Sequence, residues 1–431
     1  MLTAFARAFR TPDLRKKLLF VIGILALYRL GSVVPSPGVD YRAIHSCIDQ
    51  TQNSTVYTLV NLFSGGALLQ LSIFALGIMP YITSSIIIQL LVVVIPRLER
   101  LKKEGQAGQT KLTQYTRYLT IALAILQSTG IAALARGNPS NLFPTCNQAI
   151  LPNTSLFRIA TLVITMTAGT TVIMWLGELI TDRGIGNGMS LLIFTSIAAR
   201  LPAQGGQILT QSKFTFAVVL LLGILIVALV VFVEQAQRRI PVQYAKRMIG
   251  RRMYGGTSTY LPLKVNQAGV IPVIFASSLL YLPQLLGNVW HGNSAIHSFI
   301  VRNFSRGDSA FYVFSYFVLI VFFTYFYVAI TFNPTEVSDN MKKYGGFVPG
   351  IRPGRPTAEY LDFILSRITL PGSLYLAAIS VLPLLALGFL GGGEQFPFGG
   401  TAILILVGVG LDTVKQIESQ LMLRNYEGFL R

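Results

Sequence analysis

Long apolar runs that carry no charge, separated by short charged segments, set the pattern of this chain. In the longest of them, residues 50–96 contain no charged side chain. One membrane-crossing helix needs about 20 residues, so this run is too long for a single straight span. Gly65 and Gly66 permit a sharp bend within it, and Pro80 is expected to kink the helix that contains it.

The bend predicts a half-inserted segment from Asn61 to about Ser72, which folds back into a span from about Ala75 to Ile95. A non-helical turn at membrane depth is tolerated only where protein or a water-filled cavity covers it. We therefore expect this segment to face the inside of a hollow structure, with little exposure to lipid.

Ten apolar runs are predicted to cross the membrane, which makes the fold an all-α polytopic membrane protein. Most of the 35 Lys and Arg residues fall on the side that carries both chain ends, so the positive-inside rule places both termini in the cytoplasm. Arg29, near the outer end of the first run, is expected to extend to the interface. The predicted spans are 17–34, 75–95, 114–135, 156–178, 186–201, 214–233, 268–289, 310–332, 371–390 and 400–420.

The spans divide into two halves of five. Because five is odd, the first half ends on the side of the membrane opposite to where it began. The second half therefore enters from that opposite side, as in an inverted repeat. The predicted organisation is an N-terminal half over residues 1–201, an outer linker over 202–213 and a C-terminal half over 214–431. Composition agrees with a membrane protein, since charged residues are 12% of the chain against about 25% in soluble domains, and mean hydropathy is +0.59.

Two inner loops, residues 234–267 and 333–370, are much longer than a connection between spans requires. They hold much of the excess positive charge that gives the chain its net +18. A solvated positive-inside face is one interpretation. The lengths, the interleaved tyrosines and the Pro- and Gly-rich stretch from Pro349 to Pro356 favour a docking surface for a large anionic partner, since Arg presents a planar fork to phosphate or carboxylate.

Motifs for catalysis or cofactor binding are missing from the sequence. It contains no HExxH, no Cys/His cluster and no phosphate-binding loop. We predict that the chain is not an enzyme and holds no cofactor or metal. The acids near span ends are interpreted as solvated helix ends; they are Glu178, Asp182, Glu234 and Asp412.

The two cysteines, Cys47 and Cys146, both fall in predicted outer loops, after the first and third spans. They are either separate thiols or a disulfide that joins these loops, since the outer side is the oxidising one. A count of free thiols in the denatured, unreduced protein distinguishes the two cases.

Six sets of residues occur in one order from about Leu18 to Phe429, and together they resemble one family. They are NLFSGGAL with SIFALGIMPYI, RGIGNG, AQRRIPVQYAKR, LPLKVNQAGVIPVIFASS, FVPGIRPG and DTVKQIESQLMLRNYEGFL. The family is SecY/Sec61-alpha, whose bacterial SecY members are channel subunits of the Sec protein translocon. The closing residues are similar to those of actinobacterial members.

The resemblance implies a clamshell of two halves around an hourglass pore, with the outer linker as its hinge and the bent segment as its plug. It implies a protein-conducting channel of the bacterial plasma (inner) membrane. Such a channel translocates unfolded secretory polypeptides and releases transmembrane segments laterally into the lipid bilayer. The implied partners are the SecE and SecG subunits, the SecA motor, the ribosome, and the nascent chains of secretory and membrane proteins.

The resemblance also assigns residues to each of these functions. The pore ring is Ile78, Ile82, Met189, Ile193, Ile274 and Ile405, where Met189 departs from the aliphatic residue usual in the family. The plug comprises Asn61, Leu62, Phe63, Ser64, Gly65, Gly66, Ala67 and Leu68. Candidates for the lateral gate, in spans two and seven and nearby, are Thr83, Ser84, Gln89, Gln127, Asn266, Ser277 and Ser278. Partner docking is assigned to Arg247, Arg251, Arg252, Arg352 and Arg355, with Arg352 first among them.

Two other functions stay open. An inverted-repeat secondary transporter of a small solute shares the topology, but it would carry coupling charges within the spans and short inner loops. A membrane insertase or scaffold without a pore would lack the plug and the ring.

Overall fold

The computed structural model describes most of the chain, and all structural statements below concern that part. The cysteines Cys47 and Cys146 lie outside the described residues, as do Asn61–Phe63, Arg251 and Ser278. For Arg247 and Arg252 only the backbone is described. The described ranges are 9–44, 64–68, 70–136, 155–211, 213–244, 247–249, 252–254, 258–277, 279–280, 309–390 and 400–427.

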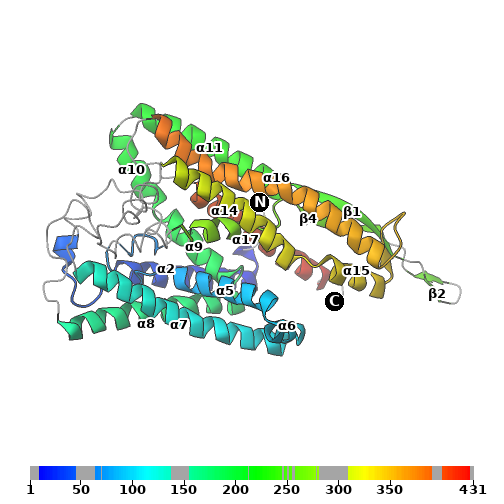
Figure 1. Ribbon diagram of the computed structural model, residues 1–431, viewed down its shortest axis with the longest axis horizontal. Helices are drawn as coiled ribbons and strands as arrows, with labels where there is room; N and C mark the ends of the chain where they lie inside the picture. The colour runs from blue at the N-terminus through cyan, green and yellow to red at the C-terminus, as the bar shows by residue number, and fades with distance from the viewer. Residues whose placement is uncertain are drawn as a thin grey trace.

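The helices form two groups that lie one above the other in Figure 1. The N-terminal group contains α2 (Pro12–Val33), α5 (Met79–Val94), α6 (Pro96–Lys103), α7 (Gln106–Arg136) and α8 (Leu156–Arg183). The C-terminal group contains α11 (Lys213–Gln235), α14 (Ala310–Thr331), α15 (Pro334–Lys343), α16 (Arg355–Leu390) and α17 (Gly400–Glu427).

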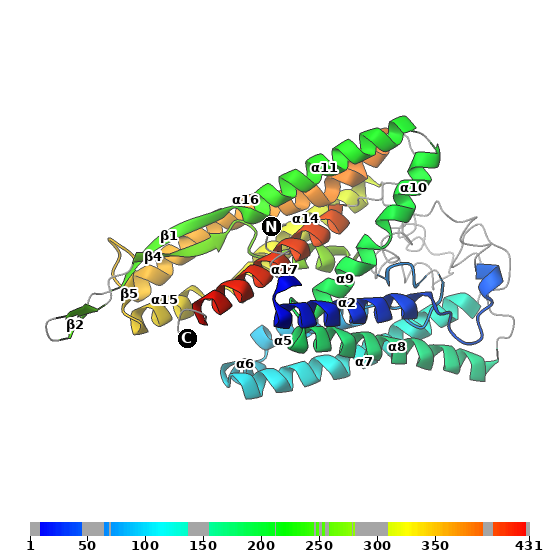
Figure 2. The same ribbon diagram turned by 180° about the vertical axis from the view of Figure 1, so that it is seen from behind.

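Two shorter helices, α9 (Gly188–Ala198) and α10 (Leu201–Gln211), connect the groups, and Figure 2 shows α17 running beside α9. The predicted linker, residues 202–213, is thus largely helical. It lies at the end of the molecule opposite the strands (Figure 1).

Nine of the predicted spans overlap these helices, and the seventh overlaps short helical stretches at 271–277 and 279–280. By length and composition, four helices of the described part are suited to cross a membrane, namely Leu156–Arg183, Phe216–Gln235, Ala310–Lys343 and Arg355–Leu382. Helices α5 and α6 are bent by 101° and would add a fifth if counted as one span. The number of ten remains a prediction.

The prediction that Pro80 kinks a helix is wrong, because Pro80 lies in the first turn of α5. The N–H groups in the first turn of a helix have no intrahelical acceptor. Proline lacks a backbone N–H, so at this position it removes no hydrogen bond of the helix. The segment before α5 is a series of turns, with Gly65 and Gly66 at φ +65° and +97°. The bend was therefore correctly placed, and the helix begins at Met79 rather than near Ala75.

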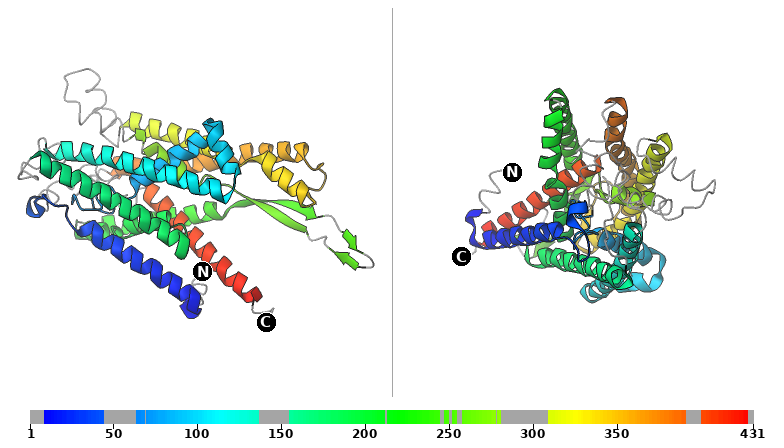
Figure 3. Two further views of the ribbon diagram at one scale, coloured as in Figure 1. Left: turned by 90° about the horizontal axis from the view of Figure 1, so that it is seen from below. Right: turned by 90° about the vertical axis from the view of Figure 1, so that its left-hand side faces the viewer.

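Strands in the two long loops, residues 234–267 and 333–370, correct the expectation of a purely α-helical fold. Strands β1 (Gln237–Tyr244), β4 (Ser258–Lys264) and β5 (Gly346–Phe347) form an antiparallel sheet in the order β4-β1-β5. A second hairpin pairs β2 (Arg247–Ile249) with β3 (Arg252–Tyr254), and the strands extend beyond the helices at one end (Figure 3). Because β5 comes from the second long loop, the sheet joins the two loops into one unit.

Alternation in β1 explains why this segment is a strand. Its burial alternates around Ile240 and Val242, the two buried positions, and both β-branched types favour strands. Ile240 packs in an apolar cluster with Val348 and with Leu361 of α16. The sheet is therefore anchored to the C-terminal group.

Close backbone approaches fix the turns that precede α5. A Cβ atom at Gly169 of α8 would overlap the carbonyl oxygen of Ile73, and one at Gly31 of α2 would overlap the ring of Phe74. The two glycines thus leave room for residues 73 and 74 between α2 and α8.

We expect Gly169→Ala to lower the thermal unfolding temperature of the purified protein. A methyl group there meets backbone that cannot rotate away, and such overpacking costs about 1–3 kcal/mol. Gly130→Ala in α7 is the matched control, because nothing lies within 4 Å of its added Cβ. This variant should unfold at the same temperature or slightly higher, and equal losses in both variants would contradict the packing described.

Candidate functional site

One apolar cluster lies where the two helix groups meet, and we call it the central cluster. It contains buried side chains from α2, α8, α9, α17 and the 271–277 stretch. Of the predicted ring, Ile78, Ile193, Ile274 and Ile405 belong to it, with 1%, 5%, 7% and 2% of their surfaces exposed. Ile82 and Met189 are partly buried and pack against it. The structure therefore brings together all six side chains from four separate segments of the chain.

Helix geometry accounts for how these side chains meet. Ile78 caps α5, and Ile82 follows one turn later with its N–H donating to the Ile78 carbonyl at 3.1 Å. Met189 and Ile193 are likewise one turn apart on α9, so each pair presents one helix face to the cluster. A Cβ at Gly177 would overlap the Met189 sulfur, so the Met189 thioether lies against α8 at this glycine.

The RGIGNG sequence makes the tight turn from α8 into α9. Asn187 caps α9 by accepting hydrogen bonds from the N–H groups of Met189 and Ser190. The N–H of Gly188 donates to the Thr181 hydroxyl at 2.9 Å, and Gly188 lies against the Gly177 carbonyl, where a Cβ would clash. This turn sets the positions of Met189 and Ile193, two of the predicted ring side chains.

The described part of the predicted plug, Ser64–Leu68, is a compact turn beneath the end of α2. The Ser64 hydroxyl accepts from the N–H of Leu68 at 3.2 Å, and Ala67 and Leu68 are almost fully buried. The guanidinium of Arg29 donates to the Gly65 carbonyl at 2.8 Å. The expectation that Arg29 extends to the membrane interface is therefore wrong, because its side chain turns to this carbonyl.

The segment that follows the plug turn pairs with the residues after α2. The N–H of Ser36 donates to the Leu71 carbonyl and that of Ile73 to the Val34 carbonyl, both at 3.0 Å, with a β-bridge between Pro35 and Ser72. Because these bonds are between backbones, they fix the path of the segment irrespective of side chains.

The predicted gate residues that the structure describes, which exclude Ser278, do not form one polar network. The hydroxyls of Thr83, Ser84 and Ser277 donate to carbonyls of their own helical stretches, at 2.7 to 2.9 Å. Asn266 instead donates from its amide to the Glu234 carboxylate at the end of α11, at 2.6 Å. Gln89 is exposed on α5 and Gln127 is partly buried on α7.

The tip of the second long loop, which we define as residues 348–355, is held by hydrogen bonds to its carbonyl groups. Gly350 and Gly354 have φ of +83° and +104°, a region that glycine enters without strain. The Thr357 hydroxyl donates to the Arg352 carbonyl at 2.9 Å and the Ser338 hydroxyl to the Gly354 carbonyl at 2.7 Å. Arg355 forms an exposed ion pair with Glu359, while Arg352 is exposed and has no ion-pair partner within the described ranges.

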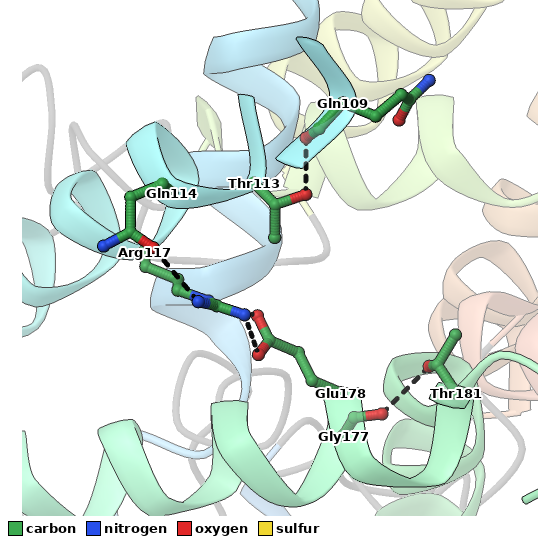
Figure 4. Close-up of polar contacts among 7 residues, drawn as sticks. All are labelled: Gln109, Thr113, Gln114, Arg117, Gly177, Glu178 and Thr181. Carbon is green, nitrogen blue, oxygen red and sulfur yellow. Dashed lines mark hydrogen bonds and ion pairs between the residues drawn. The ribbon is translucent and has the colours of Figure 1, made fainter. Parts of the chain in front are cut away.

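An ion pair between α7 and α8 was missed by the sequence analysis (Figure 4). Arg117 donates from Nε and Nη2 to the two carboxylate oxygens of Glu178, at 2.9 and 2.7 Å, and Gln114 accepts from Nη1 at 3.1 Å. The interpretation of Glu178 and Glu234 as solvated helix ends is therefore wrong. The available signal was the position of Arg117 and Glu178 at the inner ends of two consecutive, hence antiparallel, spans.

Comparison with known proteins decides the family. A family model described as SecY matches residues 72–414. The chain belongs to the SecY family. A protein translocase subunit SecY of Streptomyces galbus is 66% identical over 439 residues, with 100% of both chains covered, and it agrees with the actinobacterial similarity of the closing residues.

Solved structures share the fold at low sequence identity. A protein-conducting channel has a TM-score of 0.63 at 17% identity, covering 94% of this chain and 91% of that chain. Sec61 in a canine ribosome–channel complex from the endoplasmic reticulum has a TM-score of 0.60, with the same identity and coverage.

We expect Glu178→Gln to lower stability by about 1–2 kcal/mol, because it leaves the half-buried Arg117 charge without its partner. Thermal unfolding of the single variants and of the Arg117→Gln, Glu178→Gln double variant gives the coupling energy. Glu99→Gln is the control, since the Glu99–Lys103 pair is exposed and should contribute nothing measurable. Additive effects of the two single substitutions would contradict a direct pair.

Proposed function

We propose that the chain is the protein-conducting subunit of a translocon in the bacterial plasma membrane. It translocates unfolded secretory polypeptides and releases transmembrane segments laterally into the bilayer. The observation that carries this proposal is the gathering of the six ring side chains, contributed by both helix groups, in the central cluster. Membership of the SecY family supports it and disfavours the small-solute transporter.

An apolar ring suits the passage of a polypeptide. The six side chains lie in or against one apolar cluster, so a closed ring built from them would offer no polar partner to a hydrated ion. Dispersion and hydrophobic contacts are non-directional, so the side chains can separate around a chain of any sequence and close again without leaving unsatisfied groups. A polar lining would bind particular segments and slow their movement.

Opening of the channel would require movement of its two halves, its plug and its gate. The halves 1–201 and 214–431 would move as a clamshell about α10, the plug would leave its place, and the gate residues would separate. Ten spans with both termini in the cytoplasm accompany this arrangement. Each gate hydroxyl described above is bonded within its own helix, so separation there breaks no hydrogen bond of these groups.

Energy would come from partners, since the proposal assigns the chain no catalytic role. The tip and the sheet would form the docking surface for the SecA motor and the ribosome, with SecE and SecG as membrane partners. A structural neighbour was solved as a ribosome–channel complex, which supports the ribosome as a partner.

A photo-crosslinking residue at Ile82 or Ile274 should capture a secretory chain stalled midway, at many positions along that chain. The reason is that every segment must pass the ring. Mass spectrometry or gel shift of the crosslinked product measures this directly.

The matched control is the same probe at Leu220 of α11, where 45% of the surface is exposed on an apolar helix face. It should give no crosslinks. Absence of crosslinks at both ring positions while the motor is active would leave the ring as core packing and return the transporter to consideration.

Arg352→Ala should slow motor-driven translocation into vesicles about tenfold, because it removes one charge-assisted contact to the partner. Arg367→Ala is the control, since Arg367 is exposed on α16 outside the tip and lies over the Phe363 ring. Equal rates for Arg352→Ala and the unaltered protein, at equal amounts of folded protein, would refute the assignment of Arg352 to docking.

A further inference from the structure

Arg29 has an unusual position for a cation in an apolar helix. Its guanidinium is half-buried near the end of α2 and donates to a neutral acceptor, the Gly65 carbonyl, at 2.8 Å. A second, longer contact of 3.5 Å reaches the hydroxyl of Ser32. A charged donor is thus paired with one uncharged backbone carbonyl of the predicted plug.

The plug turn is enclosed on its other side by the end of α9. A Cβ at Gly65 would lie 3.2 Å from Cα of Ser196, and one at Gly66 would lie 3.6 Å from the guanidinium of Arg200. The Ser196 hydroxyl is bonded to the Tyr28 hydroxyl at 2.6 Å, which ties α2 to α9 beside the turn. The turn therefore lies between the ends of α2 and α9, and Arg29 donates a side-chain hydrogen bond to it from α2.

Electrostatic effects make the hydrogen bond between Arg29 and the Gly65 carbonyl easy to break. The charges of Arg29 and Arg200 repel each other, and within the described residues neither forms an ion pair with a carboxylate. A carbonyl is a weaker partner for a guanidinium than a carboxylate. Water entering from the outer side can thus replace the carbonyl more readily than it could separate a salt bridge.

We propose that Arg29 is a positioning residue that latches the plug turn in the closed channel through its bond to the Gly65 carbonyl. Arg200 adds a like charge beside the latch without bonding to the plug backbone, which keeps the latch weak enough to release. The inference rests on the proposed function, because it assigns the turn to the plug of that channel.

The test measures exposure of the plug at rest. Cys47 and Cys146 are replaced by Ser, and Ala67→Cys is introduced as a probe, since Ala67 is 0% exposed within the turn. Right-side-out vesicles that carry the whole translocon are treated with a membrane-impermeant maleimide. We expect Arg29→Gln to speed labelling of this cysteine about ten- to hundredfold, the factor for one hydrogen bond with a charged donor.

Two controls separate the latch from other causes. Arg200→Gln removes the same charge from the same neighbourhood but no bond to the plug, so labelling should be no faster than in the parent. Ala377→Cys is also 0% exposed, but it lies in α16 in a cluster that contains no plug residue, so it reports general loosening and should label slowly with or without Arg29→Gln. Unchanged labelling of Ala67→Cys, equal acceleration by Arg200→Gln, or acceleration at Ala377→Cys would each overturn the latch.

The assay uses no translocating chain and no motor, so its outcome is independent of the crosslinking experiment. If no ring crosslinks form but Arg29→Gln speeds the labelling of Ala67→Cys, the proposed channel function is refuted. The stabilising role of the contact between Arg29 and Gly65 is then retained. Ring crosslinks without any effect of Arg29→Gln would keep the channel and refute the latch.

Discussion

Apolar contact between the two helix groups is the interaction on which the rest of the structure depends. The central cluster joins α2, α8 and α9 to α17 and the 271–277 stretch, and a smaller cluster of Leu14, Leu18, Ile185 and Ile417 joins them nearer the chain ends. Such contact is strong in sum but has no preferred direction. An interface of this kind can separate and reform without a penalty for unpaired polar groups.

Polar interactions, by contrast, hold each half together. Arg117–Glu178 and Tyr28–Ser196 join helices within residues 1–201, whereas Asn266–Glu234 and Lys264–Asp412 join elements within 214–431. Each of these directional contacts would be lost on a small displacement of its partners. All four contacts lie inside one half or the other, which is the distribution that the proposed clamshell requires.

The sequence predicts those features that depend on local pattern. Apolar runs located the helices, and the glycine pair located the bend, because each reflects a property of neighbouring residues. The ring was assigned through family resemblance, since an isoleucine in a membrane helix carries no signal of its own. Strand β1 escaped prediction because its two buried positions, Ile240 and Val242, are too few to stand out among arginines. The partner of Arg29 could not be predicted, since it depends on which segments become neighbours in the fold. For Glu178 a signal existed, because Arg117 lies at the matching end of the preceding span.

Covalent connections and strand pairing link the tip to the C-terminal half. The tip leads directly into α16, β5 pairs with β1, and β1 follows α11, so the tip is attached to the C-terminal half at several points. The cluster around Ile240, Val328 and Leu361 packs the sheet against α14 and α16. If a partner docks at the tip as proposed, its load would act on the C-terminal half at all of these points. Because that half meets the other through non-directional apolar contacts, the proposed opening would take place at this boundary.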